Sequence, residues 1–281
     1  KRFLKIEKPL TIQEILKKKL TPNQLKLIPK TQEIVGKIMI LEIPEKLKSK
    51  ERIIAQTYLQ TNKNIETVVR KGEIHSGVYR LRKVKILAGK RTKETLHLEN
   101  GVRIKLDLEK TYFSSRLANE RLRIAKQIRK PEEILVMFSG AAPYPLVLAK
   151  NSPVKSIYGI EINPLAHQFA LENIKLNHFE DKIRIFEGNV SDILPKVKKK
   201  FDRILMPLPK TGEVFLPLAL KKSKKGTIIH LYAFLGEKEL QKEIKKIKEI
   251  TKGRVRILRK VKCGQFSPAV ARYCFDIKII K

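Results

Sequence analysis

The sequence predicts an α/β protein in which a doubly wound sheet of about six parallel strands is closed by an antiparallel hairpin and preceded by a smaller α+β domain. Beyond residue 130, apolar runs of strand length alternate with helical segments, as in parallel sheets with crossover helices. The last two runs, 254–264 and 271–280, are joined by a link too short for a crossover helix, so they must pair antiparallel. The runs expected to form parallel strands are 133–138, 156–162, 182–187, 201–208 and 227–234.

The chain is predicted to divide after residue 111. Residues 1–111 are expected to form the smaller α+β domain, which is rich in short strands and basic side chains, and residues 112–281 the sheet domain. An apolar stripe at helical spacing over 117–129, ended by Pro131, predicts a helix that joins the two domains.

Within the first domain, the clearest local signal is Glu99-Asn100-Gly101 between two alternating runs, which predicts a β-hairpin over 94–108. Proline is favoured at the start of a helix, so we expect a helix from Pro44 to about residue 59. The remaining runs with strand-like composition are 34–43, 66–70 and 78–87.

The net charge indicates a polyanionic partner. The 281 residues carry 62 Lys and Arg against 28 Asp and Glu, a formal charge of +34, and 42% are hydrophobic, which is enough for a packed interior. Such a surplus repels itself unless a polyanion shares the surface, and nucleic acid is the leading candidate. Because heat-adapted proteins are also lysine-rich, residues with specific chemistry must decide.

The sequence predicts no disulfide framework, metal site or membrane span. Cys263 and Cys274 are too few for either of the first two, and no histidine stands beside them at ligand spacing, so a reducing, intracellular compartment fits best. The longest apolar stretch, 134–149, is interrupted by one glycine and two prolines. No apolar signal segment follows the first residues.

Three features suggest a nucleotide site at the carboxyl ends of the first sheet strands. A small-residue turn around Gly140 would let a ligand approach the backbone. Glu161, twenty-one positions later, ends the next strand where an acidic side chain accepts hydrogen bonds from ribose hydroxyls. Asn189, after the third strand, could read an adenine edge with its amide. A tight turn, a solvated glutamate and a turn-forming Gly-Asn pair are the structural alternatives.

Two further segments carry candidate chemistry. The fourth strand ends in Met-Pro-Leu-Pro at 206–209, a rigid loop of the kind that holds a target base, or a simple strand stop. Upstream, Arg116 and Glu120 are four residues apart and share a helix face, which an ion pair would also explain.

The segment Tyr-Phe-Ser-x-Arg-Leu-x-x-Glu-Arg at 112–121 resembles the archaeal and eukaryotic tRNA (guanine-N1)-methyltransferase family, which acts at guanosine 37 beside the anticodon. The resemblance implies a Rossmann-like class I AdoMet-dependent methyltransferase domain with an antiparallel C-terminal hairpin over 112–281, and a tRNA-positioning domain over 1–111. The predicted sheet agrees with this layout. The other matching segments are 34–38, 77–82, 137–150, 161–163, 172–177, 206–210 and 264–268.

The resemblance also implies roles for single residues. Glu120 would be the general base that removes the N1 proton, and Arg80 would stabilise charge on O6 of the guanine. Phe113 would either support the flipped base or lie in the core. The expected substrate-binding residues are Tyr112, Arg116, Arg121, Pro207, Leu208 and Pro209, and those expected to bind S-adenosyl-L-methionine are Met137, Phe138, Ser139, Gly140, Glu161, Ile162, Asn189 and Val190.

The expected partner is tRNA, and the protein is expected to be a cytoplasmic monomer without a metal or a membrane contact. Two positions depart from the family pattern: Val136 stands where an acidic residue is common, and Pro207 where an asparagine often opens the Leu-Pro loop. The small additional N-terminal domain of some members is expected to be absent.

Three alternatives remain open. A wybutosine-pathway transferase would move a methyl or aminocarboxypropyl group onto a modified guanosine at position 37, although the segment at 112–121 favours N1 methylation. A non-catalytic RNA-binding protein would not need Glu120, Glu161 and the Leu-Pro loop together. An enzyme acting on a small molecule is disfavoured by the charge of +34.

Overall fold

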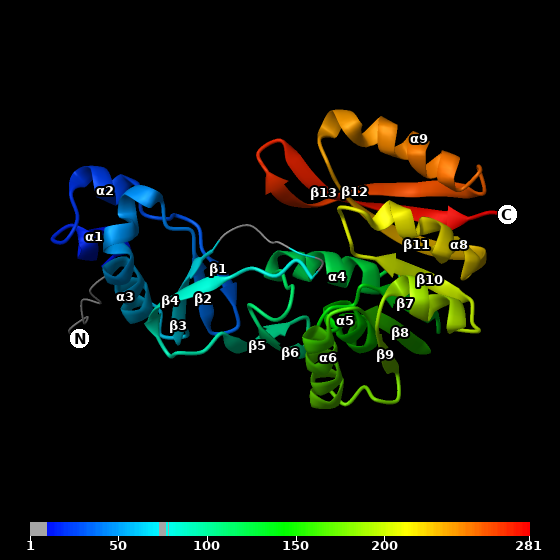
Figure 1. Cartoon of the computed structure of the whole chain (residues 1–281), viewed down its shortest axis with the longest axis horizontal. Coiled ribbons are helices and arrows are strands. Elements are labelled where there is room, and N and C mark those ends of the chain that lie inside the picture. Colours follow the sequence, from blue (N-terminus) through cyan, green and yellow to red (C-terminus); the bar gives the residue numbers. More distant parts are fainter. Residues whose placement is uncertain (1–9, 73–76, 78) are drawn as a thin grey trace, which may run out of the picture. The chain divides into compact units, whose positions relative to one another are not determined.

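The computed structural model describes residues 10–72, 77 and 79–281 (Figure 1). It divides into two compact units, Lys1–His97 with Asp107–Glu109, and Leu98–Leu106 with Lys110–Lys281. This division differs from the predicted one chiefly at Leu98–Leu106, which belongs to the second unit. Val78, where one predicted strand begins, lies outside the described residues.

The first unit contains a four-stranded mixed sheet. β2 (Ile38–Leu41) and β3 (Thr67–Lys71) are parallel, whereas β1 (Glu33–Val35) and β4 (Val84–Gly89) pair antiparallel with them at the two edges. Apolar side chains from the sheet and the helices form one buried core. The helical elements are α1 (Ile12–Leu16), α2 (Pro22–Lys26), the 3-10 helix η1 (Glu45–Lys50) and α3 (Glu51–Thr61).

Three predictions for this unit need correction. The strand expected over 78–87 is β4, which begins only at Val84. The single strand expected over 34–43 is a hairpin, β1–β2, that turns at Gly36 with φ of 54°. A Cβ at Gly36 would lie 2.3 Å from Oγ1 of Thr95, so the turn requires glycine. The helix expected from Pro44 starts as η1 and becomes α-helical only at Glu51.

The predicted hairpin at the end of this region is confirmed. β5 (Glu94–Glu99) and β6 (Val102–Asp107) form a two-stranded sheet. Asn100 and Gly101 between them have φ of 47° and 77°, the two left-handed positions of a type I′ turn.

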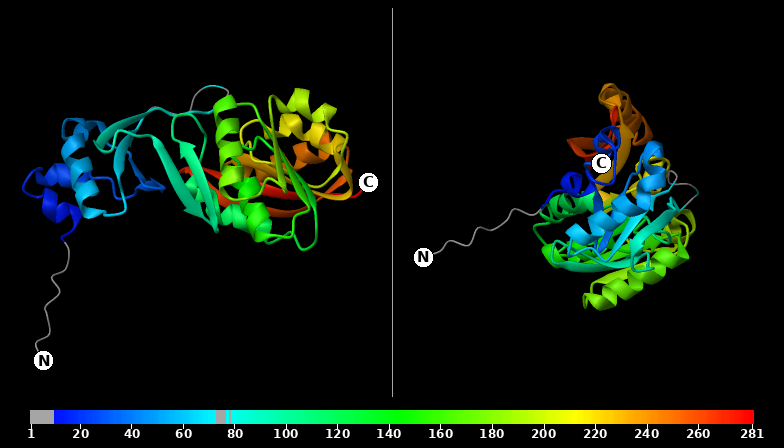
Figure 2. Two further views of the ribbon diagram at one scale, coloured as in Figure 1. Left: turned by 90° about the horizontal axis from the view of Figure 1, so that it is seen from below. Right: turned by 90° about the vertical axis from the view of Figure 1, so that its left-hand side faces the viewer.

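The second unit is built on a seven-stranded sheet with the order β12-β13-β11-β10-β7-β8-β9. Five strands are parallel, rather than about six, and β13 lies antiparallel between β11 and β12, as predicted; β12 and β13 run side by side in each view (Figure 2). The strand order reverses at β7, the point where open α/β sheets bind ligands. The strands are β7 (Glu133–Met137), β8 (Ser156–Glu161), β9 (Ile183–Glu187), β10 (Phe201–Met206), β11 (Ser223–Leu235), β12 (Val255–Ser267) and β13 (Val270–Ile279).

Helices follow the parallel strands, as predicted. α4 (Ala118–Ala125) is shorter than the expected 117–129, because Gln127 and Ile128 donate to carbonyls three residues back instead of four and so end the α-helix. No helix in the described part of the chain is long and apolar enough to cross a membrane. The other helical elements are η2 (Ser115–Leu117), α5 (Pro143–Asn151), α6 (Pro164–Leu176), α7 (Val190–Ile193), η3 (Leu194–Lys196), η4 (Gly212–Phe215), α8 (Leu216–Lys221), η5 (Glu237–Glu239) and α9 (Leu240–Ile250).

Residue alternation gives the two faces of the sheet different chemistry at β11 and β13. On one face, apolar residues such as Ile229 and Leu231 of β11 join a core cluster with α7, α8 and α9. The intervening residues point to the other face, because side chains alternate along a strand. On β11 and β13 these are His230, Tyr232, Phe234, Arg272, Cys274 and Asp276.

A buried ion pair joins α4 to the β5–β6 hairpin within the second unit. Arg121 is 1% exposed and Glu99 8% exposed. The guanidinium donates from Nη2 to Glu99 Oε2 at 2.6 Å and from Nε to Oε1, with a further bond to the Ser114 carbonyl. Its plane also lies 5.2 Å from the ring centre of Phe113, which is buried in the core. All these contacts are internal, so Arg121 acts here as a structural residue.

We predict that Arg121→Ala lowers the free energy of unfolding by about 3–5 kcal/mol, because it removes the guanidinium that forms a bidentate ion pair with the buried Glu99 carboxylate. Denaturant titration measures this loss. Lys246→Ala is the matched control: its pair with Glu213 is 2.9 Å long but partly exposed, so the change should stay below about 1 kcal/mol. Full stability of Arg121→Ala together with lost activity would instead assign Arg121 to substrate contact.

Candidate active site

The polar face of β11 and β13 carries three successive cross-strand pairs. His230 lies opposite Asp276, Tyr232 opposite Cys274, and Phe234 opposite Arg272. His230, Tyr232, Cys274 and Asp276 are buried. Buried polar groups must find internal partners, and α4 supplies them.

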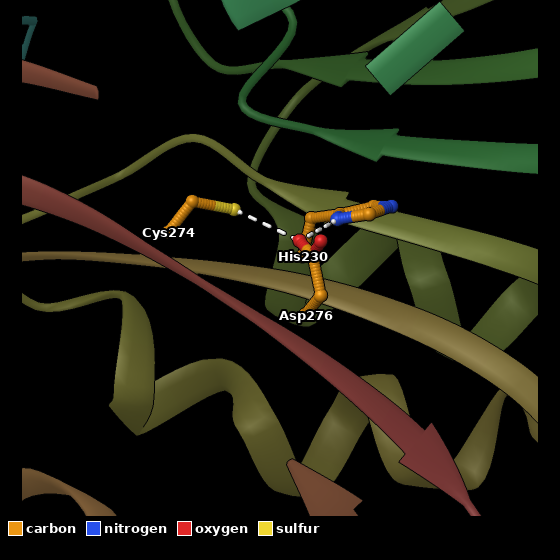
Figure 3. A group of neighbouring side chains, drawn as sticks. All are labelled: His230, Cys274 and Asp276. Carbon is orange, nitrogen blue, oxygen red and sulfur yellow. Dashed lines mark hydrogen bonds and ion pairs between the residues drawn. The ribbon is translucent and has the colours of Figure 1, made fainter. Parts of the chain in front are cut away.

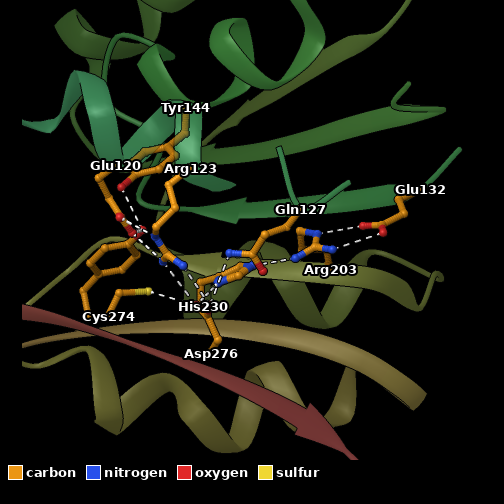
Figure 4. Close-up of polar contacts among 10 residues, drawn as sticks. Glu120, Arg123, Gln127, Glu132, Tyr144, Arg203, His230, Cys274 and Asp276 are labelled. Carbon is orange, nitrogen blue, oxygen red and sulfur yellow. Dashed lines mark hydrogen bonds and ion pairs between the residues drawn. The ribbon is translucent and has the colours of Figure 1, made fainter. Parts of the chain in front are cut away.

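Glu120 of α4 lies toward one end of this arrangement (Figure 4). Its carboxylate is 4% exposed and accepts from Nε and Nη2 of Arg123 at 2.6 and 2.8 Å. The Tyr232 hydroxyl donates to Oε1 at 2.7 Å and accepts from the Tyr144 hydroxyl at 2.9 Å. Burial raises the pKa of both tyrosines well above the usual value, so both hydroxyls stay protonated and can donate.

Arg123 joins Glu120 to a second buried carboxylate. Its Nη1 and Nη2 lie 2.8 and 3.2 Å from the two carboxylate oxygens of Asp276. Burial opposes the charge on Arg123, but the bonds to Glu120 and Asp276 outweigh it and raise the pKa of the guanidinium. Burial likewise acts against the Asp276 charge, yet His230 and Arg123 bring its pKa well below the usual value. The Arg123–Asp276 pair is therefore ionised.

The network continues from Asp276 through His230 to Arg203. Nδ1 of His230 is 2.6 Å from Asp276 Oδ1, and Nε2 is 2.7 Å from Nη1 of Arg203, which also forms a bidentate pair with Glu132 (Figure 4). Burial lowers the pKa of His230, so the ring is neutral. These partners assign the tautomer: Nδ1–H donates to the carboxylate, and Nε2 accepts from the guanidinium.

The network contains one carboxyl group more than it has guanidinium groups. Three carboxylates, of Glu120, Asp276 and Glu132, face the two guanidinium groups of Arg123 and Arg203. Glu120 is the carboxylate that stands at the end of the network, beside Tyr232.

His230, Cys274 and Asp276 also form a group whose ligand atoms lie within 4.8 Å of one another (Figure 3). The sequence spacing did not reveal this, because strand register, and not chain distance, brings His230 beside Cys274. The atoms already have other partners: His230 and Arg123 occupy the Asp276 carboxylate, and burial raises the pKa of the Cys274 thiol and keeps it protonated. We assign this group to the polar network, and the expected lack of a metal stays a prediction.

The loop after β7 has an unusual backbone. Phe138, Gly140 and Ala142 have φ of 60°, 58° and 65°. For the two non-glycine residues this conformation costs about 1–3 kcal/mol each, and such strain is concentrated at ligand-binding sites. Ser139 adds a buried hydroxyl without a partner among the described residues.

Glu161 fixes this loop to the end of β8. Its Oε2 accepts from the Gly140 amide at 2.6 Å and its Oε1 from the Asn163 amide at 2.8 Å. Burial raises the pKa of this carboxyl, although backbone N–H groups of Asn163, Gly140 and Ile162 act against the shift. These N–H groups occupy only part of the acceptor capacity of the carboxylate, and together with the Ser139 hydroxyl the remaining donors and acceptors fit a nucleoside.

The other residues predicted to bind the cofactor differ in access. Met137 and Val190 are buried in the core, so only their backbone could contact a ligand. Phe138 and Ile162 are half-buried, and the Phe138 ring meets Phe215 edge to face at 5.0 Å. Asn189 caps α7 by accepting from the Ser191 amide at 2.9 Å, which is the turn-forming alternative; its amide nitrogen remains a possible donor.

The predicted substrate residues of the second unit lie near the same strands, with one exception. The Pro209 carbonyl accepts from the Phe234 amide at 3.0 Å, which fastens the loop of Pro207, Leu208 and Pro209 to β11. The Tyr112 hydroxyl accepts from Arg272 at 3.0 Å, and Arg116 is exposed. The exception is Arg121, which the Glu99 pair removes from the surface.

Arg80, the second predicted catalytic residue, belongs to the first unit, whereas Glu120 belongs to the second. Arg80 is half-buried with φ of 53°, and its amide donates to the Gly77 carbonyl at 3.2 Å. A left-handed backbone conformation is uncommon for arginine, and such residues are concentrated at functional sites. Its role toward a guanine stays a prediction.

Sequence reasoning missed Arg123, Tyr232, His230 and Asp276. Arg123 could have been found, since it lies three residues after Glu120 and so shares its helix face. For the others the signal was polar residues at every second position of otherwise apolar strands. Only the strand pairing shows that they meet.

The chain is similar to known proteins of one family. Residues 95–258 match the TRM5/TYW2 methyltransferase domain and residues 12–92 the TYW2 N-terminal domain. The Trm5b tRNA (guanine(37)-N(1))-methyltransferase of Pyrococcus abyssi is 37% identical over 228 residues, which cover 81% of this chain and 66% of that relative. The tRNA(Phe) (4-demethylwyosine(37)-C(7)) aminocarboxypropyltransferase of Pyrococcus horikoshii is 34% identical over 275 residues, 96% of each chain.

Solved structures agree as well. The complex of aTrm5 with tRNALeu superposes with a TM-score of 0.84 at 32% identity, over 98% of this chain and 79% of that one. Pyrococcus horikoshii TYW2 in complex with MeSAdo gives a TM-score of 0.81 at 30% identity, over 96% and 98%. The predicted fold class and the expected cofactor, S-adenosyl-L-methionine, are thereby confirmed. The chain belongs to the TRM5/TYW2 methyltransferase family.

Proposed function

We propose that this protein transfers the methyl group of S-adenosyl-L-methionine to N1 of guanosine 37 in tRNA. The observation that carries the proposal is the buried carboxylate of Glu120 on the Tyr-Phe-Ser-x-Arg-Leu-x-x-Glu-Arg segment, held by Arg123 and Tyr232. The Pyrococcus abyssi relative named for this reaction supports it. We further propose that the protein acts as a cytoplasmic monomer without a metal.

The chemistry of guanine explains why a fixed carboxylate is needed. N1 carries a proton and is a poor nucleophile, so a base must take that proton as the new bond forms. Glu120 would accept it at a carboxylate oxygen, and Arg123 and Tyr232 would keep that oxygen in place. The bound cofactor supplies the electrophilic methyl group. Arg80 would stabilise the negative charge that develops on O6.

The remaining site residues would position the two substrates. The strained loop at Ser139 and Gly140, with Glu161, would hold the nucleoside part of the cofactor. Tyr112 and Arg116 would contact the tRNA, together with the loop of Pro207, Leu208 and Pro209, whose proline backbone is rigid. Arg121 would support α4 instead of touching substrate. Removal of the N1 proton and transfer of the methyl group would thus take place at the same edge of the sheet.

A second candidate is aminocarboxypropyl transfer to a modified guanosine at position 37. It is favoured by two observations: the relative named for that activity covers 96% of both chains, and residues 12–92 match the TYW2 N-terminal domain.

One experiment separates these functions. Two RNAs are used, a tRNA transcript with guanosine 37 and a tRNA that carries the modified guanosine at this position. Each is incubated with cofactor labelled either in the methyl group or in the carboxyl carbon, and reverse-transcription stops are mapped. Methyl label with a stop at position 37 supports N1 methylation, whereas carboxyl label in RNA that carries the modified guanosine supports the second candidate. A transcript with adenosine 37 is the control, because adenine N1 has no proton to remove.

We predict that Glu120→Gln lowers turnover by about 10²-fold or more and leaves cofactor affinity nearly unchanged, since the amide cannot accept the proton. Single-turnover kinetics and calorimetry measure the two effects. Glu132→Gln is the matched control, because it changes a carboxylate at the far end of the same network and should cost much less. An equal loss of cofactor affinity in Glu120→Gln would point to a structural role.

We predict that Glu161→Ala weakens cofactor binding by about 1–3 kcal/mol, because the ribose hydroxyls lose their acceptor and the loop at Gly140 loses its anchor. Calorimetry with the full chain gives the affinity, and tRNA affinity serves as the internal control that should not move. Unchanged cofactor affinity would contradict this placement of the ribose.

A further inference from the structure

A pair of aromatic rings in contact, one exposed and one half-buried, lies at the end of the polar face, in a segment that the proposed reaction does not use. Phe266 of β12 is 53% exposed, although it is a large apolar side chain. Its ring centre lies 4.3 Å from that of Phe234, with 33° between the planes. An exposed ring beside a second ring offers a π face on which a base could stack.

The guanidinium group of Arg272, on β13, packs against one of these two rings. The Arg272 guanidinium lies 5.0 Å from the ring centre of Phe234, and its Nη2 donates to the Tyr112 hydroxyl at 3.0 Å. Gln265, next to Phe266, is held by the carbonyls of Ser267 and Val270. The rings are therefore held in place before any ligand binds, which reduces the entropy cost of binding.

These rings, which we call the platform, lie near the partner of Glu120 on β11. Tyr232, which donates to Glu120, and Phe234 are two residues apart on β11 and point to the same face, so they are separated by about 7 Å along the strand. The Phe234 amide also holds the Pro209 carbonyl. The distance corresponds to about two stacked bases, so a base on the platform would be a near neighbour of one placed at Glu120.

The chain around the platform is strongly cationic. Residues 251–275 contain no Asp or Glu. The arginines and lysines of β12, an edge strand, are exposed. Aromatic rings beside a cationic track are the combination that binds unpaired nucleotides, with rings for the bases and cations for the phosphates. The basic residues of this segment are Lys252, Arg254, Arg256, Arg259, Lys260, Lys262 and Arg272.

We propose that Phe266, backed by Phe234 and Arg272, is a stacking platform for one unpaired base of the anticodon loop, at positions 36 to 38. The inference rests on the proposed function for the identity of the RNA. It adds a base-binding surface on the C-terminal hairpin, separate from Glu120 and from the cofactor loop. Stacking requires only a π face, so the platform positions the loop without reading its sequence.

The test is a binding cycle without cofactor. Anticodon stem-loops with a single abasic nucleotide at 36, 37 or 38 are titrated with the full chain and with Phe266→Ala, by fluorescence anisotropy. Phe266→Ala should weaken binding of the intact stem-loop about 5- to 100-fold. At one of the three positions the abasic penalty seen with the unaltered chain should disappear in Phe266→Ala, because ring and base act as one pair.

Two variants control for structure. Leu258→Ala removes another exposed apolar side chain of β12, 46% exposed, and should leave affinity unchanged. Phe266→Tyr keeps the ring and should restore binding. Equal abasic penalties at all three positions in both proteins, or no binding of the stem-loop by the unaltered chain, would overturn the inference. Group transfer to full tRNA is measured separately, so a positive cycle without transfer would reject only the proposed reaction.

Discussion

The arrangement of the candidate site depends on one guanidinium group. Arg123 holds Glu120 on its own helix and Asp276 on β13, so it fixes the distance between α4 and the polar face of the sheet. Two buried carboxylates would repel each other without a shared cation. With it, Glu120 keeps a defined position while its oxygens remain hydrogen-bonded. The fold thus places the Glu120 carboxylate in a buried position.

The antiparallel hairpin at the end of the chain creates the surface that Arg123 holds. In this unit β13 lies between β11 and β12, and its register sets Asp276 against His230, Cys274 against Tyr232 and Arg272 against Phe234. Strand alternation sends these residues to one face and the apolar core residues to the other. The same register therefore supplies the buried network at one end and exposed aromatic rings at the other.

Much of the architecture could be predicted because it depends on local patterns. The parallel strands, the final hairpin and the Asn100-Gly101 turn follow from apolar runs and turn chemistry. The β1–β2 turn at Gly36 could not be separated from a continuous strand, since its need for glycine comes from Thr95, far along the chain. Likewise, Glu120 stood out through its motif, but Asp276, which binds the same Arg123 guanidinium, is visible only through strand register.

Glu161 connects the predicted ribose-binding position with the loop at Gly140. Its carboxylate was expected to serve a ribose, and the structure shows that it also binds the backbone of the loop at Gly140. These uses are compatible, because hydrogen bonds from backbone N–H groups occupy only part of its acceptor capacity. They also couple the loop to the ligand, since the carboxylate that would receive the hydroxyls stabilises the left-handed residues around it. The strained loop and the Glu161 carboxyl group therefore belong to the same site. This site lies where the strand order of the sheet reverses, one strand away from the loop that follows β10.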